Sequence, residues 1–71
     1  MYINEDIPLP KHLPRPLQRD IEILQDYYDT GNDAYYYPYL EAFEAGIHQC
    51  YIDQQITKEE AYRLMQRYGI G

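Results

Sequence analysis

Few residues in this sequence are of the kinds that perform catalysis, and their spacing suits it poorly. The single cysteine, Cys50, lies two positions after His48. Residues two apart on a helix point to different faces, so these two side chains cannot act as a thiolate and its base. Glu44 and His48 are four apart and could supply two metal ligands, but a lone pair at this spacing is typical of a solvated helix face. We therefore expect no enzyme activity, no metal and no other cofactor.

The segment from Asp53 to Glu60 resembles the second half of a calcium-binding EF-hand loop running into its exit helix. With Glu60 at the twelfth position, the first, third and sixth positions are Gln49, Tyr51 and Gln54. Calcium requires carboxylates early in the loop, and the turn requires glycine at the sixth position. The segment therefore predicts turn and helix-cap structure without a calcium site.

Acidic residues are concentrated in the middle of the chain. The 71 residues include twelve acidic and six basic side chains, a net charge of −6, and residues 20–57 contain no lysine or arginine. An acidic block repels phosphate backbones and anionic lipid, so we expect no direct binding to nucleic acid or to membranes. The natural complement is a protein partner with a basic surface.

The sequence carries no sign of export. One cysteine cannot form an internal disulfide. The first six residues are acidic where a signal peptide is basic, and no stretch approaches the ~20 apolar residues of a membrane span. These features predict a cytoplasmic protein in a reducing compartment.

Tyrosine is unusually common, with ten residues and no tryptophan. Many of these tyrosines alternate with acidic residues between positions 27 and 41. A tyrosine ring is large, rigid and apolar with a polar tip, which is typical of an interface anchor. Two interpretations are open: the rings pack as a small core around a turn, or they form an exposed contact patch. The candidate partner-binding residues are Tyr27, Tyr35, Tyr36, Tyr37 and Tyr39.

The acidic residues support an alternative function. Glu22, Asp26 and Asp29 are spaced by four and three, so on a helix they share one face. Carboxylates gathered on one surface can imitate phosphates and occupy the nucleic-acid groove of another protein, although the same spacing fits an ordinary solvated face. The candidate residues for this acidic face are Glu22, Asp26, Asp29, Asp33, Glu41 and Glu44.

Four prolines among residues 7–16 mark the beginning of the chain. Proline fixes φ and lacks an amide hydrogen, so residues 1–15 are predicted to form an extended arm. Its apolar residues Ile7, Leu9 and Leu13 are expected to lie over the helices.

Residues 16–71 are predicted to form a domain of three helices, at about 16–29, 38–53 and 58–68. The first begins at Pro16, which suits the first helical position, and ends before Gly31. Pro38 favours a start of the second helix near 37 or 38, and Asp33 as its cap is the competing choice. The expected inward residues are Leu17, Ile21, Leu24 and Tyr28 in the first helix, and Leu40, Phe43, Ile47, Cys50 and Gln54 in the second, with Tyr36 extending this second series backwards.

The third helix has the strongest local signals. Thr57 and Glu60 form a capping-box pattern, so the helix begins at Lys58. Gly69 follows it as the left-handed residue, which places Ile70 where a Schellman motif brings it onto Met65. The last two helices are joined by a short turn and are expected to form an antiparallel hairpin.

The segment from Gly46 to Gly69 resembles a known kind of hairpin. Its pattern is a helix, then Asp-x-x-Ile-Thr-x-Glu-Glu at 53–60, then a short helix that ends in Tyr-Gly-Ile. This pattern resembles the C-terminal helical hairpin of the short bacterial domains called SHOCT, and it is similar to small uncharacterised proteins of bacterial conjugative elements and prophages. The resemblance covers about a third of the chain. It implies an oligomerisation or interaction role without catalytic residues.

The expected protein is therefore an all-α three-helix domain with a proline-rich arm. A chain of this length buries little surface and is marginally stable alone, which favours self-association. We expect a non-catalytic protein–protein interaction or oligomerisation module that forms a homo-oligomer. The alternative is an acidic nucleic-acid mimic that inhibits a DNA- or RNA-binding protein, of the antirestriction or anti-CRISPR type.

Overall fold

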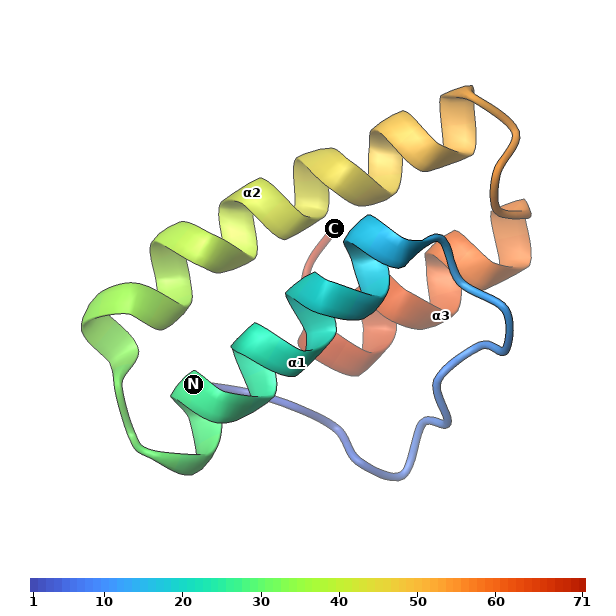
Figure 1. Cartoon of the computed structure of the whole chain (residues 1–71). Coiled ribbons are helices and arrows are strands. Elements are labelled where there is room, and N and C mark those ends of the chain that lie inside the picture. Colours follow the sequence, from blue (N-terminus) through green and yellow to red (C-terminus); the bar gives the residue numbers. More distant parts are fainter.

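The computed structural model describes all 71 residues as three helices without a strand: α1 (Arg15–Asp29), α2 (Asp33–Ile52) and α3 (Lys58–Tyr68). In Figure 1, α2 is the longest helix and runs antiparallel to both of the others. Its backbone comes close to both α1 and α3, whereas the backbones of α1 and α3 stay further apart from each other. The predicted all-α three-helix fold is therefore confirmed, and none of its helices combines the length and apolar character needed to cross a membrane.

The core is formed where α1 and α3 meet α2. Phe43 of α2 lies edge to face with Tyr68 of α3, with ring centroids 5.1 Å apart. Gly46 faces α1, where an added Cβ would lie at ordinary van der Waals distance, 3.6 Å, from a methyl of Leu17. The largest fully buried side chains are Leu17, Leu24, Tyr36, Phe43, Ile47, Leu64 and Tyr68. Gln54 does not belong to this stripe, because α2 has ended and Gln54 is an exposed turn residue with φ of +62°.

The second helix begins earlier than the favoured prediction, at Asp33, so Pro38 lies inside it. Proline at this position leaves only the carbonyl of Ala34 without its helical partner, and Ala34 is exposed, so water can bind that oxygen. The early start also places Tyr36 on the buried stripe with Phe43. Burial of this ring outweighs the local preference of Pro38 for a helix start.

Local signals set the ends of α1 and α3. Helix α1 begins at Arg15, one residue before the prediction, with Pro16 in its first turn. At α3 the capping box is present: the Glu60 amide donates to Thr57 Oγ1 at 3.1 Å, and the Thr57 amide donates to Glu60 Oε1 at 2.7 Å. The Schellman motif also forms after this helix, with Gly69 at φ of +65°.

The arm (residues 1–14) contributes to the core and bridges α1 and α3 (Figure 1). Ile3, Pro10 and Leu13 are buried, whereas Ile7 is half-buried and Leu9 is exposed. Leu9 is 38% exposed but lines two hollows together with Ile21 and Glu22 of α1, so it lies over that helix at the edge of the core, as predicted, and Pro10 is buried in addition.

Arg67 of α3 holds the arm in place. This side chain is buried, its Nη1 donates to the carbonyl of Ile7 at 2.7 Å, and its own carbonyl accepts from the Asn4 amide at 2.7 Å. At the other end of the arm, the Tyr36 hydroxyl donates to the Tyr2 carbonyl at 2.8 Å. All three bonds join segments far apart in sequence, so the arm is fixed on two helices.

Candidate functional site

The five candidate tyrosines divide into three groups. Tyr36 is 0% exposed, so it is a core residue and not a contact residue. Tyr37 packs edge to face against the Tyr36 ring, with centroids 5.4 Å apart, and is half exposed on the side of α2 that lies beside α3. Tyr27, Tyr35 and Tyr39 gather where α1 turns into α2, and we call these three residues the tyrosine elbow.

The tyrosine elbow is one continuous aromatic cluster across two helices. The ring of Tyr27 on α1 stacks on Tyr35 of α2, with centroids 5.9 Å apart and planes at 25°. Its other contact is with Tyr39, one turn further along α2, at 6.1 Å and 70°. Tyr35 is 62% exposed, whereas Tyr27 and Tyr39 are half-buried beneath it. Both open interpretations therefore apply in part: two rings form a support and the third is presented to solvent.

A carboxylate fixes the inner ring of the elbow. The Tyr39 hydroxyl donates to Asp20 Oδ1 of α1 at 2.9 Å. Burial raises the pKa of Tyr39, and the hydrogen bond to Asp20 and the negative charge of Asp20 raise it further, while Arg19 acts in the opposite direction. Tyr39 therefore stays protonated as a donor at neutral pH and ties α2 to α1.

The surroundings of the elbow are acidic. The helix ends next to the elbow carry two exposed carboxylates, Asp29 as the last residue of α1 and Asp33 as the first of α2, and Asp29 also lines the hollow that contains Arg67. A solvent-facing ring supported by other rings, beside carboxylates, suits the cationic side chains arginine and lysine, since the ring face attracts cations and the carboxylates pair with them.

The six acidic candidates do not form one surface. Glu22, Asp26 and Asp29 line a hollow of about 370 Å³ between α1 and the arm, together with Arg67. Glu41 and Glu44 line a different hollow of about 320 Å³ on α2, beside Ile70. Asp33 stands apart in the first turn of α2, exposed. The spacing correctly predicted that the α1 carboxylates share a face, but it did not show that the buried guanidinium of Arg67 lies beneath them.

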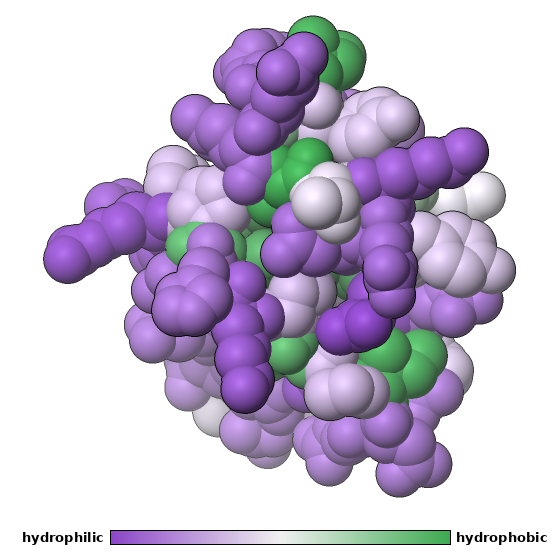
Figure 2. All heavy atoms as spheres, turned by 90° about the vertical axis from the view of Figure 1, so that its right-hand side faces the viewer, coloured by the Kyte–Doolittle hydropathy of each residue, from purple (hydrophilic) through white to green (hydrophobic).

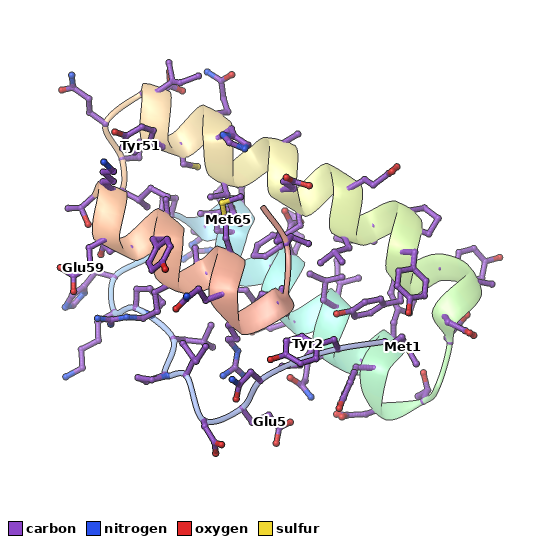
Figure 3. The ribbon with its side chains drawn as sticks, turned by 180° about the vertical axis from the view of Figure 1, so that it is seen from behind. Met1, Tyr2, Glu5, Tyr51, Glu59 and Met65 are labelled. Carbon is purple, nitrogen blue, oxygen red and sulfur yellow. The ribbon has the colours of Figure 1, made fainter.

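A third surface, not predicted from the sequence, lies on the outer side of the α2–α3 hairpin. An apolar groove of about 230 Å³ runs between the two helices, and Figure 3 shows Tyr51 of α2 and Met65 of α3 on this side. Its lining residues are Ile47, His48, Tyr51, Lys58, Ala61, Tyr62 and Met65. Helical spacing could have revealed it, because Tyr37, Glu41, Glu44, His48 and Tyr51 follow one another at steps of four and three.

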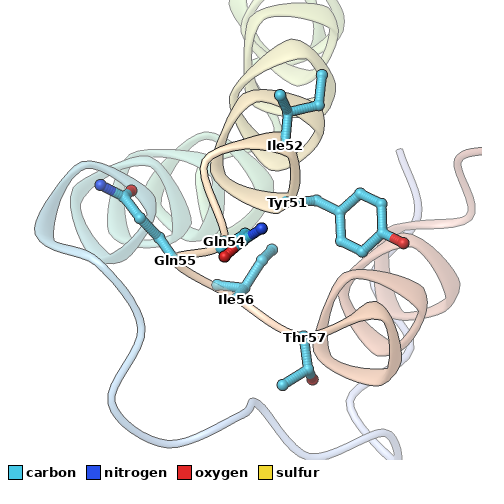
Figure 4. Close-up of a pocket in the computed structure, with 6 residues that line it drawn as sticks. All are labelled: Tyr51, Ile52, Gln54, Gln55, Ile56 and Thr57. Carbon is cyan, nitrogen blue, oxygen red and sulfur yellow. The ribbon is translucent and has the colours of Figure 1, made fainter.

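The largest hollow, about 500 Å³, lies at the turn between α2 and α3. Figure 4 shows that the side chains of Tyr51, Ile52, Gln55 and Thr57 point in different directions around it. In the space-filling view of this end of the molecule, the surface is largely hydrophilic with small separate apolar groups (Figure 2). A ligand site needs polar groups that point toward one common position, and these side chains do not, so this hollow gives no candidate site.

The two residues considered for catalysis, His48 and Cys50, are not brought together. Cys50 is buried, and burial raises the pKa of its thiol, which disfavours the reactive thiolate. His48 is exposed on the hairpin. No three histidine, cysteine, aspartate or glutamate side chains lie close enough together to hold a metal ion.

Comparison with known proteins adds no relative to these observations. We find no family model, curated protein or solved structure that matches this chain. The resemblance of residues 46–69 to SHOCT-like hairpins therefore stays a prediction, and the candidate surfaces rest on their own geometry.

Proposed function

We propose that this protein is a protein–protein interaction module whose tyrosine elbow binds a basic protein surface. The observation that carries the proposal is the exposed ring of Tyr35, stacked on Tyr27 above Tyr39. Aromatic anchors that are held rigid before binding lose little conformational freedom when a partner docks, and such residues dominate interface energies.

Charge supports a basic partner over a second copy at this surface. In a two-fold symmetric contact the same patch lies on both sides. Two elbows placed together would bring Asp29 and Asp33 of each copy close to the same residues of the other, which is repulsive. Arginine or lysine side chains of a different protein would instead stack on Tyr35 and pair with these carboxylates.

A second candidate function is the acidic nucleic-acid mimic. It is supported by one observation: Glu22, Asp26 and Asp29 all border the same hollow of α1. Against it, Glu41 and Glu44 border a separate hollow, and Arg67 places a positive charge beside the α1 row. Only half of the proposed acidic face is therefore continuous.

Two single variants test the elbow with matched exposure. Tyr35 on the elbow and Tyr62 on α3 are each 62% exposed. Immobilised wild-type protein, Tyr35→Ser and Tyr62→Ser would each be used to capture binding proteins from native lysate at about 0.1 M and about 0.5 M salt, with mass spectrometry of what is retained. The proposal predicts that wild type and Tyr62→Ser retain the same basic protein, that Tyr35→Ser loses it, and that high salt weakens its capture.

The alternatives give different results. Retention of the same partner by Tyr35→Ser would overturn the elbow proposal. If the captured protein binds nucleic acid and is lost with the triple variant Glu22→Gln, Asp26→Asn, Asp29→Asn, while Tyr35→Ser still holds it, the mimic is the better account. Wild-type protein should then block nucleic-acid binding by this partner, whereas the triple variant should not.

A further inference from the structure

The outer side of the hairpin forms a second, separate surface, which we call the hairpin face. On α2 a step of four and three residues keeps side chains on one side of the helix. By the same geometry Tyr35 and Tyr39 lie on the opposite side of α2 from Tyr37 and Tyr51. The residues of the hairpin face are Tyr37, Glu41, Glu44, His48 and Tyr51 of α2 and Lys58, Tyr62 and Met65 of α3.

Apolar side chains line the middle of this face, and two tyrosines beside them are open to solvent. Met65 and Ile47 line the groove between the helices, and Tyr51 and Tyr62 stand beside it, 44% and 62% exposed. The end of the chain folds back over the same side: an added Cβ at Gly71 would lie 3.0 Å from the Met65 Cε, and Ile70 lies in the hollow beside Glu44. Figure 3 shows this final segment rising from α3 toward α2.

The two ends of the hairpin face carry opposite charge. Lys58 is the charged residue that lines the groove at the end near the α2–α3 turn. Glu41 and Glu44 line the hollow at the other end, beside Ile70. Glu59 lies close to Lys58 in sequence, but it is paired with Arg63 at 3.3 Å. The face is therefore polarised along its length, with an apolar middle.

A polarised face of this kind is complementary to itself. A two-fold axis through the middle turns one copy end to end, so Lys58 of each copy meets the Glu41 and Glu44 end of the other. The apolar groove of each copy then covers the other, and Tyr51 and Tyr62 lie within the contact. A parallel arrangement would place like charges together and is disfavoured.

We propose that two copies of this chain associate through the hairpin face in an antiparallel, two-fold symmetric dimer. This contact leaves the tyrosine elbow free on the opposite side of α2, so the dimer would present two elbows to partners. The dimer does not depend on the function proposed for the elbow, and either proposal can fail alone.

Light scattering and sedimentation equilibrium over a concentration series test the dimer. Wild type should approach twice the 8.6 kDa of the chain as concentration rises. Tyr62→Ser should raise the dimer dissociation constant about tenfold or more, whereas Tyr35→Ser, with equal exposure, should leave it unchanged. Unfolding curves of both variants would show that each is folded.

A charge exchange tests the orientation. Lys58→Glu alone places a third carboxylate against the acidic end, and Glu44→Lys alone places a second cation against the basic end, so each should weaken the dimer. The double variant Lys58→Glu, Glu44→Lys again has opposite charges facing each other across the two-fold axis, so it should recover most of the wild-type association. A wild type that stays monomeric at all concentrations, an association lost in Tyr35→Ser but kept in Tyr62→Ser, or no recovery in the double variant would each overturn the proposal.

Discussion

Alkaline pH should destabilise the fold through Tyr36. Burial raises the pKa of Tyr36 from 10.0 to about 12, and the neighbouring Tyr68 adds to the rise. In the unfolded chain this hydroxyl ionises near 10.0, whereas in the folded protein it stays protonated until about 12. The folded state therefore binds more protons between these values. The stability that neutral Tyr36 contributes is complete below pH 10 and is lost as the pH rises toward 12.

The expected loss is large for a domain of this size. A pKa difference of about two units corresponds to about 3 kcal/mol of unfolding free energy, against the ~5 kcal/mol typical of a small domain. At about pH 11 roughly half of this amount is already lost. Tyr36→Phe keeps the ring but removes the 2.8 Å bond to the Tyr2 carbonyl, which costs about 1 kcal/mol at neutral pH. The variant should thus be less stable than wild type at neutral pH and more stable above about pH 11.

Urea unfolding followed by helical circular dichroism, repeated at stepwise higher pH, measures this crossing. Tyr35→Phe, at the exposed ring of the elbow, controls for the loss of one tyrosinate charge from the molecule. If the stability of Tyr36→Phe and wild type falls in parallel, with no crossing, the assignment of the alkaline sensitivity to buried Tyr36 is refuted.

Three further substitutions test how the fold is held. Arg67→Met removes the donor to the Ile7 carbonyl and should lower the unfolding free energy by about 1–2 kcal/mol, with faster hydrogen exchange at arm amides measured by NMR; unchanged exchange would contradict the role of Arg67 in fixing the arm. Thr57→Ala should cost about 1 kcal/mol in urea unfolding through loss of the capping box, while Thr57→Ser should keep it. Gly69→Ala should lower the melting temperature more than Gly31→Ala. Both glycines have positive φ, but only at Gly69 would the new Cβ meet another atom, 2.8 Å away in the Tyr2 ring. Equal losses of melting temperature in the two variants would contradict that contact.

The fold could be predicted wherever the signals are local. Thr57 with Glu60 and the glycine at 69 fix both ends of α3, and the apolar spacing fixes the inward stripe of α1. The start of α2 could not be predicted in this way. There the local preference of Pro38 is outweighed by the burial of Tyr36, whose partner Tyr2 lies 34 positions away.

The candidate site was harder to predict for the same reason. Composition indicated a tyrosine cluster, but the division into buried Tyr36, elbow ring Tyr35 and hairpin ring Tyr37 follows only once the helix is known to begin at Asp33. Arg67 carries no local signal at all, since the carbonyl that it binds lies 60 positions away in the arm. Long-range contacts of this kind are not encoded in periodicity.

The tyrosine elbow as the binding surface is the central claim, and NMR mapping tests it most directly. Isotope-labelled protein would be titrated with the basic partner retained by capture, and amide shifts would be followed along the whole chain. We expect the largest changes at Tyr27 and at residues 33–39 and none at residues 58–66, and we expect Tyr35→Ser to abolish them. Changes confined to α3, or to the α1 row at Glu22 and Asp26, would contradict it.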